Sequence, residues 1–257
     1  MPAETVLITG ASSGIGLELA RLFAADGSDL VLVARREAAL QRLAADLQAR
    51  HGITAHVAPH DLADPAAPQA LYDRLAGQGV TVDVVVNNAG FGAHGAVAEL
   101  DLSRQLAMIQ VNVTALTHLT RLFLPGLLAR NRGGVLNVAS TAAFQPGPYM
   151  AVYYATKAYV LSFTEALAEE VAETPLTVTC LCPGPTDTGF ADEAGMAASR
   201  LFRLGAMEAR TVARRGYEAF RDGRVVAIPG LKNKAGAAGV RFLPRAVVRR
   251  LVRALQA

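Results

Sequence analysis

Short apolar runs and stretches of helical spacing alternate along the chain. Runs rich in apolar and β-branched residues occupy positions 5–9, 30–34, 54–58, 82–86, 135–139, 176–181 and 225–228. Apolar residues recur every three or four positions over 15–25, 37–50, 103–129 and 151–172, and again after the turn signal Asp64-Pro65. Short runs of this kind are typical of strands, and the wider spacing is typical of helices. The alternation predicts an α/β fold, a Rossmann-type doubly wound parallel sheet of about seven strands with helices on both faces.

One segment interrupts this alternation. Residues 186–222 contain no clear strand, and we expect them to form helical turns that lie as a flap over the carboxyl edge of the sheet. A strand at 225–228 and a basic helix at 245–256 then complete the fold. Because no low-complexity linker or internal repeat divides the chain, residues 1–257 are expected to form a single domain.

Composition excludes several classes of protein. With 257 residues, 52% hydrophobic and 18% charged, the chain can bury a large core, which argues against disorder and against a small disulfide scaffold. Cys180 and Cys182 lie too close together for an ordinary bridge and have no metal-ligand set around them, so we expect them to be buried and expect no metal site. Prolines interrupt the longest uncharged stretch, 133–156, and residues 1–4 lack the regions of a signal peptide, which predicts a cytoplasmic protein.

The net charge of +3 is the sum of two unlike parts. Residues 1–202 carry 12 basic and 19 acidic side chains, net −7, whereas residues 203–257 carry 13 basic and 3 acidic side chains, net +10. In the helix 245–256, arginines and apolar residues fall on opposite faces, as in a helix that packs on a sheet, joins an oligomer or contacts an anionic membrane surface. We favour packing on the sheet. No nucleic-acid partner is expected, because the basic tail lacks aromatic interleaving and a recognised reading module.

The first candidate site lies between the first predicted strand and the first predicted helix. Residues 9–16 read Thr-Gly-Ala-Ser-Ser-Gly-Ile-Gly. Glycines in this place allow a sharp turn and the close approach of a pyrophosphate, whose charge is met by the N–H groups and dipole of the helix start. The alternative is a turn with a structural role only. The residues expected to bind a dinucleotide here are Gly10, Ser12, Ser13, Gly14, Ile15 and Gly16.

The end of the second predicted strand indicates which dinucleotide binds. A site for NAD usually offers a carboxylate to the ribose hydroxyls at this place. Here Ala34 is followed by Arg35 and Arg36, and guanidinium groups pair well with a ribose phosphate. The sequence therefore favours NADP over NAD, with Arg35 as the expected contact, although two solvated arginines at a strand end are the alternative.

A tyrosine and a lysine are spaced for one helix face. Tyr153 precedes Lys157 by four residues, and Lys157 is one of only three lysines beside 22 arginines. A phenol titrates near pH 10, and a neighbouring ammonium is expected to lower its pKa toward the range of a general acid for a carbonyl that receives hydride. This spacing is common by chance, so the pair indicates a catalytic role only together with the other motifs of the chain.

This combination of motifs resembles the short-chain dehydrogenase/reductase family in its single-domain form. The resemblance covers nearly the whole chain and combines several motifs in order. They are Thr-Gly-x-x-x-Gly-Ile-Gly at residues 9–16, Asp61-Leu62, Asn87-Asn88-Ala89-Gly90, Asn112, Ser140, Tyr153-x-x-x-Lys157 and Pro183-Gly184.

The resemblance implies a catalytic set of four residues. Tyr153 would be the acid/base, and Lys157 would bind the nicotinamide ribose and lower the tyrosine pKa. Ser140 would hydrogen-bond the substrate carbonyl, and Asn112 would hold a water molecule in a proton relay. Taken singly, each residue has a structural alternative, such as a cap, a turn former or a buried polar group.

The same resemblance implies further cofactor contacts. Asp61 and Leu62 would flank the adenine, and Asn87 and Asn88 would form the wall behind the ribose and the sheet centre. Pro183 and Gly184 would also bind the cofactor, and Thr186 and Thr188 after them would meet the carboxamide.

Together these features predict an NADP-dependent oxidoreductase acting on a small carbonyl or secondary alcohol substrate, with a homodimer or homotetramer as its expected assembly. A non-catalytic NADP-binding sensor or scaffold is the alternative, which the complete catalytic set argues against. The fold is expected to gather a largely apolar substrate pocket. The loop residues expected in it are Phe91, Phe144, Gln145, Tyr149, Met150, Phe190 and Met196.

Overall fold

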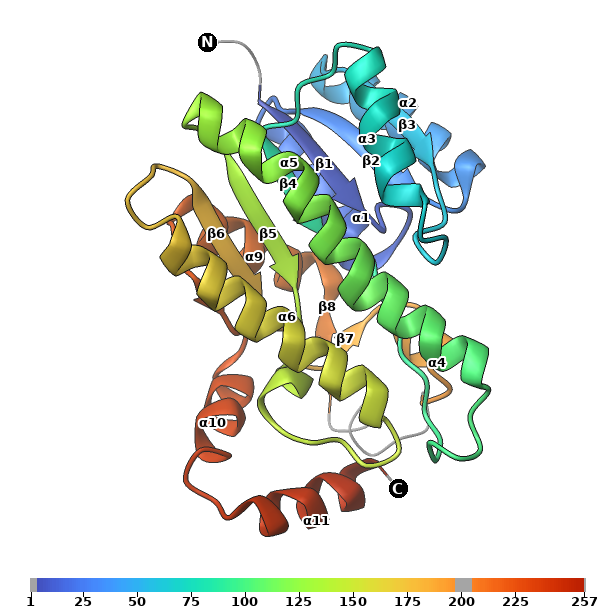
Figure 1. Ribbon diagram of the computed structural model, residues 1–257, viewed down its shortest axis with the longest axis vertical. Coiled ribbons are helices and arrows are strands. Elements are labelled where there is room, and N and C mark those ends of the chain that lie inside the picture. Colours follow the sequence, from blue (N-terminus) through green and yellow to red (C-terminus); the bar gives the residue numbers. More distant parts are fainter. Residues whose placement is uncertain (1–3, 197–204, 257) are drawn as a thin grey trace.

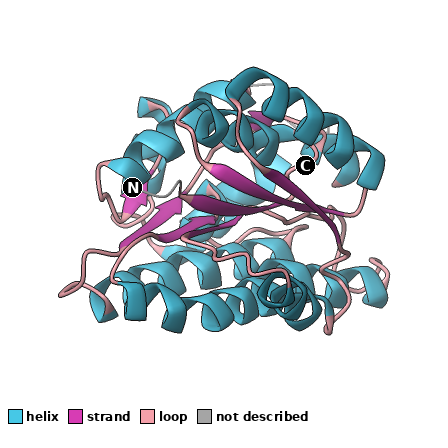
Figure 2. Cartoon of the chain, turned by 90° about the horizontal axis from the view of Figure 1, so that it is seen from above, coloured by secondary structure: helices cyan, strands magenta, loops and turns pink. Residues whose placement is uncertain are grey.

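The computed structural model describes residues 4–196 and 205–256 and shows one parallel sheet between two layers of helices (Figure 1, Figure 2). Its strand order is β3-β2-β1-β4-β5-β6-β9. The strands are β1 (Thr5–Thr9), β2 (Asp29–Ala34), β3 (Ala55–Pro59), β4 (Val84–Asn87), β5 (Gly134–Val138), β6 (Thr177–Leu181) and β9 (Val226–Ala227). The predicted Rossmann-type doubly wound sheet is thereby confirmed. The order reverses between β1 and β4, which is where such sheets bind ligands.

Helices cover both faces of the sheet. The first layer consists of α1 (Gly14–Ala25), α2 (Glu37–His51) and α9 (Ala209–Arg221). The second consists of α3 (Ala67–Gly77), α5 (Leu116–Arg130) and α6 (Ala151–Glu170). In β1, Val6 and Ile8 face the first layer and Leu7 faces the second, so all three are fully buried. Burial on both faces explains why these strands are apolar at successive positions.

The long helix predicted at 103–129 contains a local change of winding. It runs as α4 (Leu102–Ile109), a π-helical turn η1 (Gln110–Ala115) and then α5. Single π-helical turns within α-helices occur often at functional sites. Here the turn contains Asn112.

The predicted flap is shorter than expected. Within 186–222 the described residues form β7 (Thr186–Asp187), α7 (Phe190–Glu193), the strand β8 (Met207–Glu208) paired with β7, and α9; residues 197–204 lie outside the described residues. Instead of lying over the carboxyl edge, α9 packs on α1 with Val212, Ala213 and Phe220 buried. The flap prediction was therefore wrong for 209–221. The apolar residues of this segment form one helix face that packs on α1, while the arginines between them stay at the surface.

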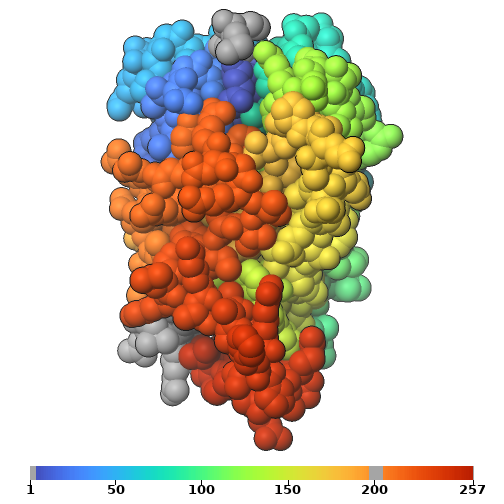
Figure 3. Space-filling model, turned by 90° about the vertical axis from the view of Figure 1, so that its left-hand side faces the viewer, coloured from blue at the N-terminus to red at the C-terminus, as the bar shows by residue number. Residues whose placement is uncertain are grey.

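The last two helices lie at one end of the molecule. They are α10 (Leu231–Gly239) and α11 (Arg245–Gln256). Figure 1 shows them beyond the carboxyl edge of the sheet, with the end of α11 close to the start of α6, and in Figure 3 the red C-terminal residues form the lower end of the molecule. The helix α11 has the predicted bounds, but its buried residues Val248 and Val252 pack on loops and on α6 instead of on the sheet. No helix in the described chain is long and apolar enough to cross a membrane.

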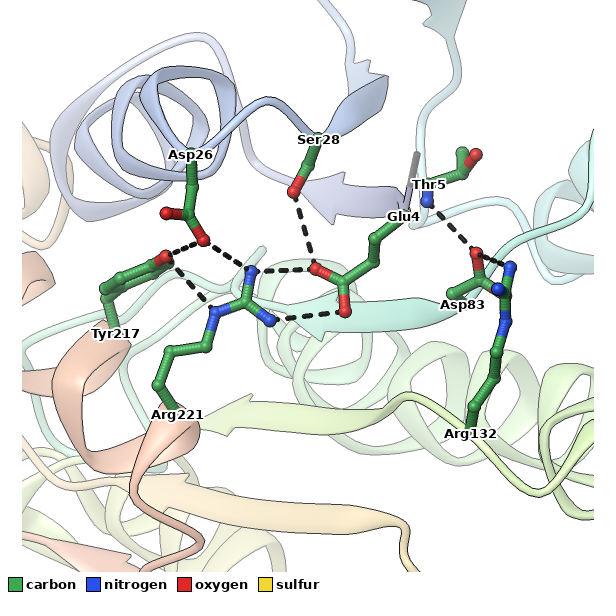
Figure 4. A network of polar contacts seen from close by, with 8 residues as sticks. All are labelled: Glu4, Thr5, Asp26, Ser28, Asp83, Arg132, Tyr217 and Arg221. Carbon is green, nitrogen blue, oxygen red and sulfur yellow. Dashed lines mark hydrogen bonds and ion pairs between the residues drawn. The ribbon is translucent and has the colours of Figure 1, made fainter. Parts of the chain in front are cut away.

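An arginine on α9 ties the first strand to the first helical layer (Figure 4). Arg221 donates from Nη1 and Nη2 to the two carboxylate oxygens of Glu4 at 3.2 and 2.8 Å, and from Nη2 to Asp26 Oδ2 at 3.2 Å. Its guanidinium carbon also lies 5.2 Å from the ring centroids of Phe23 and Tyr217. This one side chain therefore joins β1, α1 and α9.

We expect the substitution Arg221→Ala to lower the free energy of unfolding by about 2 kcal/mol, because it removes charge-assisted hydrogen bonds and the stacking on Phe23 together. Arg214→Ala on the same helix is the control, since the Arg214 side chain is 72% exposed and, among the described residues, pairs only with Glu218. It should cost no more than about 0.5 kcal/mol. Urea unfolding followed by circular dichroism measures both values, and equal losses would contradict the proposed role of Arg221.

Candidate active site

A cavity of about 780 Å³ opens at the carboxyl ends of the central strands. It brings together most of the residues singled out from the sequence. Those that line it are Gly10, Ser12, Ser13, Gly14, Ile15, Arg35, Asp61, Leu62, Asn88, Ser140, Tyr153, Lys157, Pro183, Gly184, Thr186 and Thr188. Gly16, Asn87 and Asn112 are not among its lining residues, so any role they have there is through other groups.

The glycine loop is held close against β4. Asn88 donates from Nδ2 to the Thr9 carbonyl at 2.8 Å, and a Cβ on Gly16 would lie 2.4 Å from that nitrogen and from the Gly10 oxygen. Gly10 has a φ of +68°, which also favours glycine. No side chain in the described chain caps the start of α1 at Ser13, so its first N–H groups are available to a bound anion. These features fit the pyrophosphate of a dinucleotide.

Two arginines flank this loop at the end of β2. Arg36 donates from Nη2 to Ser12 Oγ at 3.2 Å, and Arg35 Nη2 lies 3.7 Å from Glu193 Oε1 across the cavity mouth. Both guanidinium groups line the cavity. The sequence pattern predicted Arg35 as the contact, although Arg36 next to it carries the same signal. The contact with Ser12 makes Arg36 at least an equal candidate for a phosphate contact.

Tyr153, Ser140 and Lys157 converge in the middle of the cavity. Tyr153 and Lys157 lie on one face of α6, and the Lys157 Nζ atom is 5.9 Å from the Tyr153 ring centroid. Lys157 Nζ donates to the Val138 carbonyl at the end of β5 at 2.8 Å. Ser140 follows the same strand, and its Oγ donates to the Pro183 carbonyl at 3.3 Å. The ends of β5 and β6 thus fix two of these side chains from one side, while α6 presents Tyr153 from the other.

Burial has the largest effect on the pKa of both Tyr153 and Lys157. It raises the pKa of Tyr153, with a smaller opposite effect of the Ser140 hydroxyl. It lowers the pKa of Lys157 to about 8. We expected the ammonium to lower the tyrosine pKa, but in the protein alone the loss of solvation has the larger effect. The phenol therefore stays protonated, and Lys157 stays charged, at neutral pH.

This arrangement makes stability depend on pH. The unfolded Lys157 side chain keeps its proton up to about pH 10.5, whereas the folded one loses it near pH 8, so the unfolded state binds more protons between these values and stability rises with pH. From pH 8 to about pH 9.5 we expect wild type to gain about 2 kcal/mol in free energy of unfolding relative to Lys157→Met. Urea titrations at both pH values measure this difference. An identical pH dependence in the variant would contradict it.

Asn112 acts on the backbone around the cavity. Its Oδ1 accepts from the Phe91 N–H at 3.1 Å, and its Nδ2 donates to the Phe91 carbonyl and to Thr156 Oγ1, both at 3.0 Å. The π-helical turn presents this side chain to the loop after β4 and to α6 together. The loop that carries Phe91 and the helix that carries Tyr153 are therefore positioned by one amide.

Asn87 belongs to a buried polar chain behind the cavity. It donates from Nδ2 to Thr120 Oγ1 at 3.0 Å and to Asn137 Oδ1 at 2.9 Å. Asn137 in turn donates to Thr164 Oγ1 at 2.9 Å. These bonds link β4 and β5 to α5 and α6, so Asn87 lies at the sheet centre, as expected, but does not reach the cavity.

The outer end of the cavity, away from the glycine loop, contains apolar loop residues. Of the loop residues expected there, Phe91, Gln145, Met150, Phe190 and Met196 line it, whereas Phe144 and Tyr149 do not. Tyr154 and Gln256, which were not predicted from the sequence, also line it. Nothing in the local pattern of α11 indicates that its last turn reaches the first turn of α6.

The fold and this cavity define a dinucleotide-dependent oxidoreductase, and comparisons with known proteins agree. A family model described as short chain dehydrogenase matches residues 4–198. A putative ketoacyl reductase of the granaticin polyketide synthase from Streptomyces violaceoruber is 38% identical over 188 residues, which cover 72% of this chain and 69% of that protein.

Solved structures show the same likeness over more of the chain. A short-chain dehydrogenase from Sphingobium yanoikuyae in complex with NADPH superposes with a TM-score of 0.84 at 33% identity, over 93% of this chain and 92% of that one. One from Burkholderia phymatum in complex with NAD gives 0.83 at 29% identity, over 99% and 97%. The chain belongs to the short-chain dehydrogenase/reductase family and is an oxidoreductase of the nicotinamide-dependent kind.

Proposed function

We propose that this protein is an NADP-dependent reductase of small, largely apolar carbonyl compounds that also oxidises the corresponding secondary alcohols. The observation that carries the proposal is the convergence of Tyr153, Ser140 and Lys157 in one cavity with the glycine loop. NADPH supplies the hydride when it is bound. The residues of the chain then have to bind and orient the carbonyl compound and deliver a proton to its oxygen.

The geometry supports separate roles for the three side chains. The Ser140 hydroxyl can turn from the Pro183 carbonyl to donate a hydrogen bond to the substrate oxygen. Tyr153, kept protonated by burial, donates the proton as negative charge develops on that oxygen. Lys157, charged at neutral pH, binds the ribose and favours the phenolate that remains. Asn112 serves as a positioning residue for this set through its contacts with Phe91 and Thr156.

The cofactor preference is part of the proposal. Arg35 and Arg36 offer two guanidinium groups at the end of β2, and Ala34 stands where a carboxylate would favour NAD. The NADPH complex of the relative from Sphingobium yanoikuyae agrees with this preference. Because the relative from Burkholderia phymatum holds NAD in a similar fold, the fold alone does not select the cofactor, and the proposed preference rests on these side chains.

We further propose that the protein is a homo-oligomer that assembles through α4, α5 and α6. Apolar side chains are exposed along this surface, among them Leu102, Leu106 and Ile109 on α4 and Tyr159 on α6. An apolar surface of this kind is typical of a subunit contact. Light scattering after gel filtration gives the assembly, and a monomer at micromolar concentration would contradict it.

The reaction is tested by NADPH oxidation with a panel of aldehydes, ketones, ketoacyl thioesters and steroids. The proposal predicts turnover of at least one carbonyl class. NADPH binding without turnover of any class would overturn it.

A further inference from the structure

The last turn of α11 closes the outer end of the cavity. Gln256 is 2% exposed and lines the cavity together with Tyr154 of α6. Val248 and Val252, on the same face of α11, are buried beside Tyr154 and fix the helix there. His94 Nε2 lies 3.1 Å from the Gln256 carbonyl oxygen and holds the helix end. Two segments about a hundred residues apart thus meet in one wall.

Tyr154 and Gln256, the two polar side chains in this wall, use only part of their hydrogen-bonding capacity. Gln256 donates from Nε2 to the Tyr154 hydroxyl oxygen at 2.7 Å. Its Oε1 is buried and has no hydrogen-bond partner in the described chain. Because the Tyr154 oxygen accepts this bond, its own O–H remains a donor. If the amide turns over, Oε1 accepts from Tyr154, both N–H groups of Nε2 become free, and the Tyr154 oxygen can still accept. Either orientation therefore leaves at least one donor and one acceptor unpaired.

The side chains around Tyr154 and Gln256 leave the free hydrogen-bonding groups of this pair to a bound molecule. Met150, Val248 and Val252 pack in the same buried cluster as Tyr154 and offer no polar side-chain group. An unpaired buried donor or acceptor costs free energy, so the bound molecule has to pair with both. A carboxylate or sulfonate offers acceptors only, and an ammonium offers donors only. A hydroxyl or an amide group offers one of each.

We propose that Tyr154 and Gln256 form a substrate subsite for a hydroxyl or amide group that the carbonyl compound carries away from its reacting carbon. This subsite rests on the proposed function, because Tyr153 beside it is the proton donor there; the ring centroids of Tyr153 and Tyr154 lie 6.1 Å apart. The substrate class is therefore narrower than apolar ketones in general. It comprises ketones or aldehydes with an apolar body and one remote group that both donates and accepts a hydrogen bond.

The test compares matched pairs of substrates. The probes are ω-hydroxy methyl ketones of increasing chain length, each beside the methyl ketone in which a methyl group replaces the hydroxyl. At the best length, wild type should prefer the hydroxy ketone by about 10-fold or more in kcat/KM. Gln256→Met and Tyr154→Phe should each bring this ratio close to one. Leu255→Ala, on a neighbouring position of α11, is the control and should keep the wild-type ratio.

Two further measurements separate failure of the subsite from failure of the enzyme. NADPH binding by fluorescence verifies that each variant keeps a folded cofactor site. Calorimetric titration of the same ketone pairs into the chain gives their affinity ratio without turnover. If wild type reduces ketones but shows no preference at any length, or if Gln256→Met keeps the preference, the subsite is wrong and the proposed function stands. If neither ketone is reduced, the full carbonyl panel decides whether the proposed function fails, and an equal affinity for both ketones overturns the subsite without any turnover.

Discussion

Replacing Tyr153 by Phe should lower the rate of NADPH-dependent carbonyl reduction by about 10²- to 10⁴-fold and leave the affinity for NADPH within about twofold of wild type. The substitution removes only the proton donor. The ring keeps its contacts with Phe190 and Tyr154, whose centroids lie 5.2 and 6.1 Å away. Stopped-flow absorbance gives the rate of reduction, and fluorescence titration gives the affinity.

Tyr159→Phe is the matched control for this experiment. Tyr159 lies on the same helix, is 40% exposed and bonds to Thr117 Oγ1 at 2.9 Å, outside the cavity. Its loss should change the rate by less than about twofold. If Tyr153→Phe reduces carbonyl compounds as fast as wild type, another group delivers the proton and the catalytic assignment is wrong.

The second large effect concerns the choice of cofactor. Arg35→Ala combined with Arg36→Ala should raise the Kd for NADPH by about 100-fold and change the Kd for NADH little, because only NADPH carries the ribose phosphate. Of the single variants, Arg36→Ala should have the larger effect, since Arg36 already lies against Ser12 of the glycine loop, while Arg35 is directed toward Glu193.

Arg42→Ala is the control for charge alone, because Arg42 is exposed on α2 and does not line the cavity. Titration of each variant with both cofactors at one ionic strength gives the ratio of affinities. Equal losses of affinity for NADPH and NADH would show that the arginines stabilise the glycine loop and do not bind the ribose phosphate.

The sequence was sufficient for the sheet and for most of the cavity wall. Apolar runs such as residues 5–9 predict strands buried on both faces, and the parallel order then brings every strand end to one edge. The glycines of the first turn, Ser140 and the pair Tyr153 and Lys157 follow strand ends or begin helices at that edge. Motif spacing therefore predicted residues that the fold brings together in the cavity.

Long-range packing decided the features that the sequence did not reveal. Whether α9 lies in a flap or on α1, and whether α11 reaches Tyr154, depends on contacts between segments far apart in the chain. The pKa of Tyr153 was misjudged for a related reason. The spacing to Lys157 is visible in the sequence, whereas the burial that dominates the titration is a property of the assembled cavity.

The most direct test of the central claim follows the hydride itself. Wild type is incubated with NADPH that carries deuterium at the transferable position and with each carbonyl class of the panel, and the alcohol product is analysed by mass spectrometry. Hydride transfer to the carbonyl carbon, with a proton from Tyr153 to the oxygen, predicts an alcohol with one deuterium on the former carbonyl carbon and almost no such product from Tyr153→Phe. An alcohol without deuterium, or equal labelled product from the variant, would contradict the account.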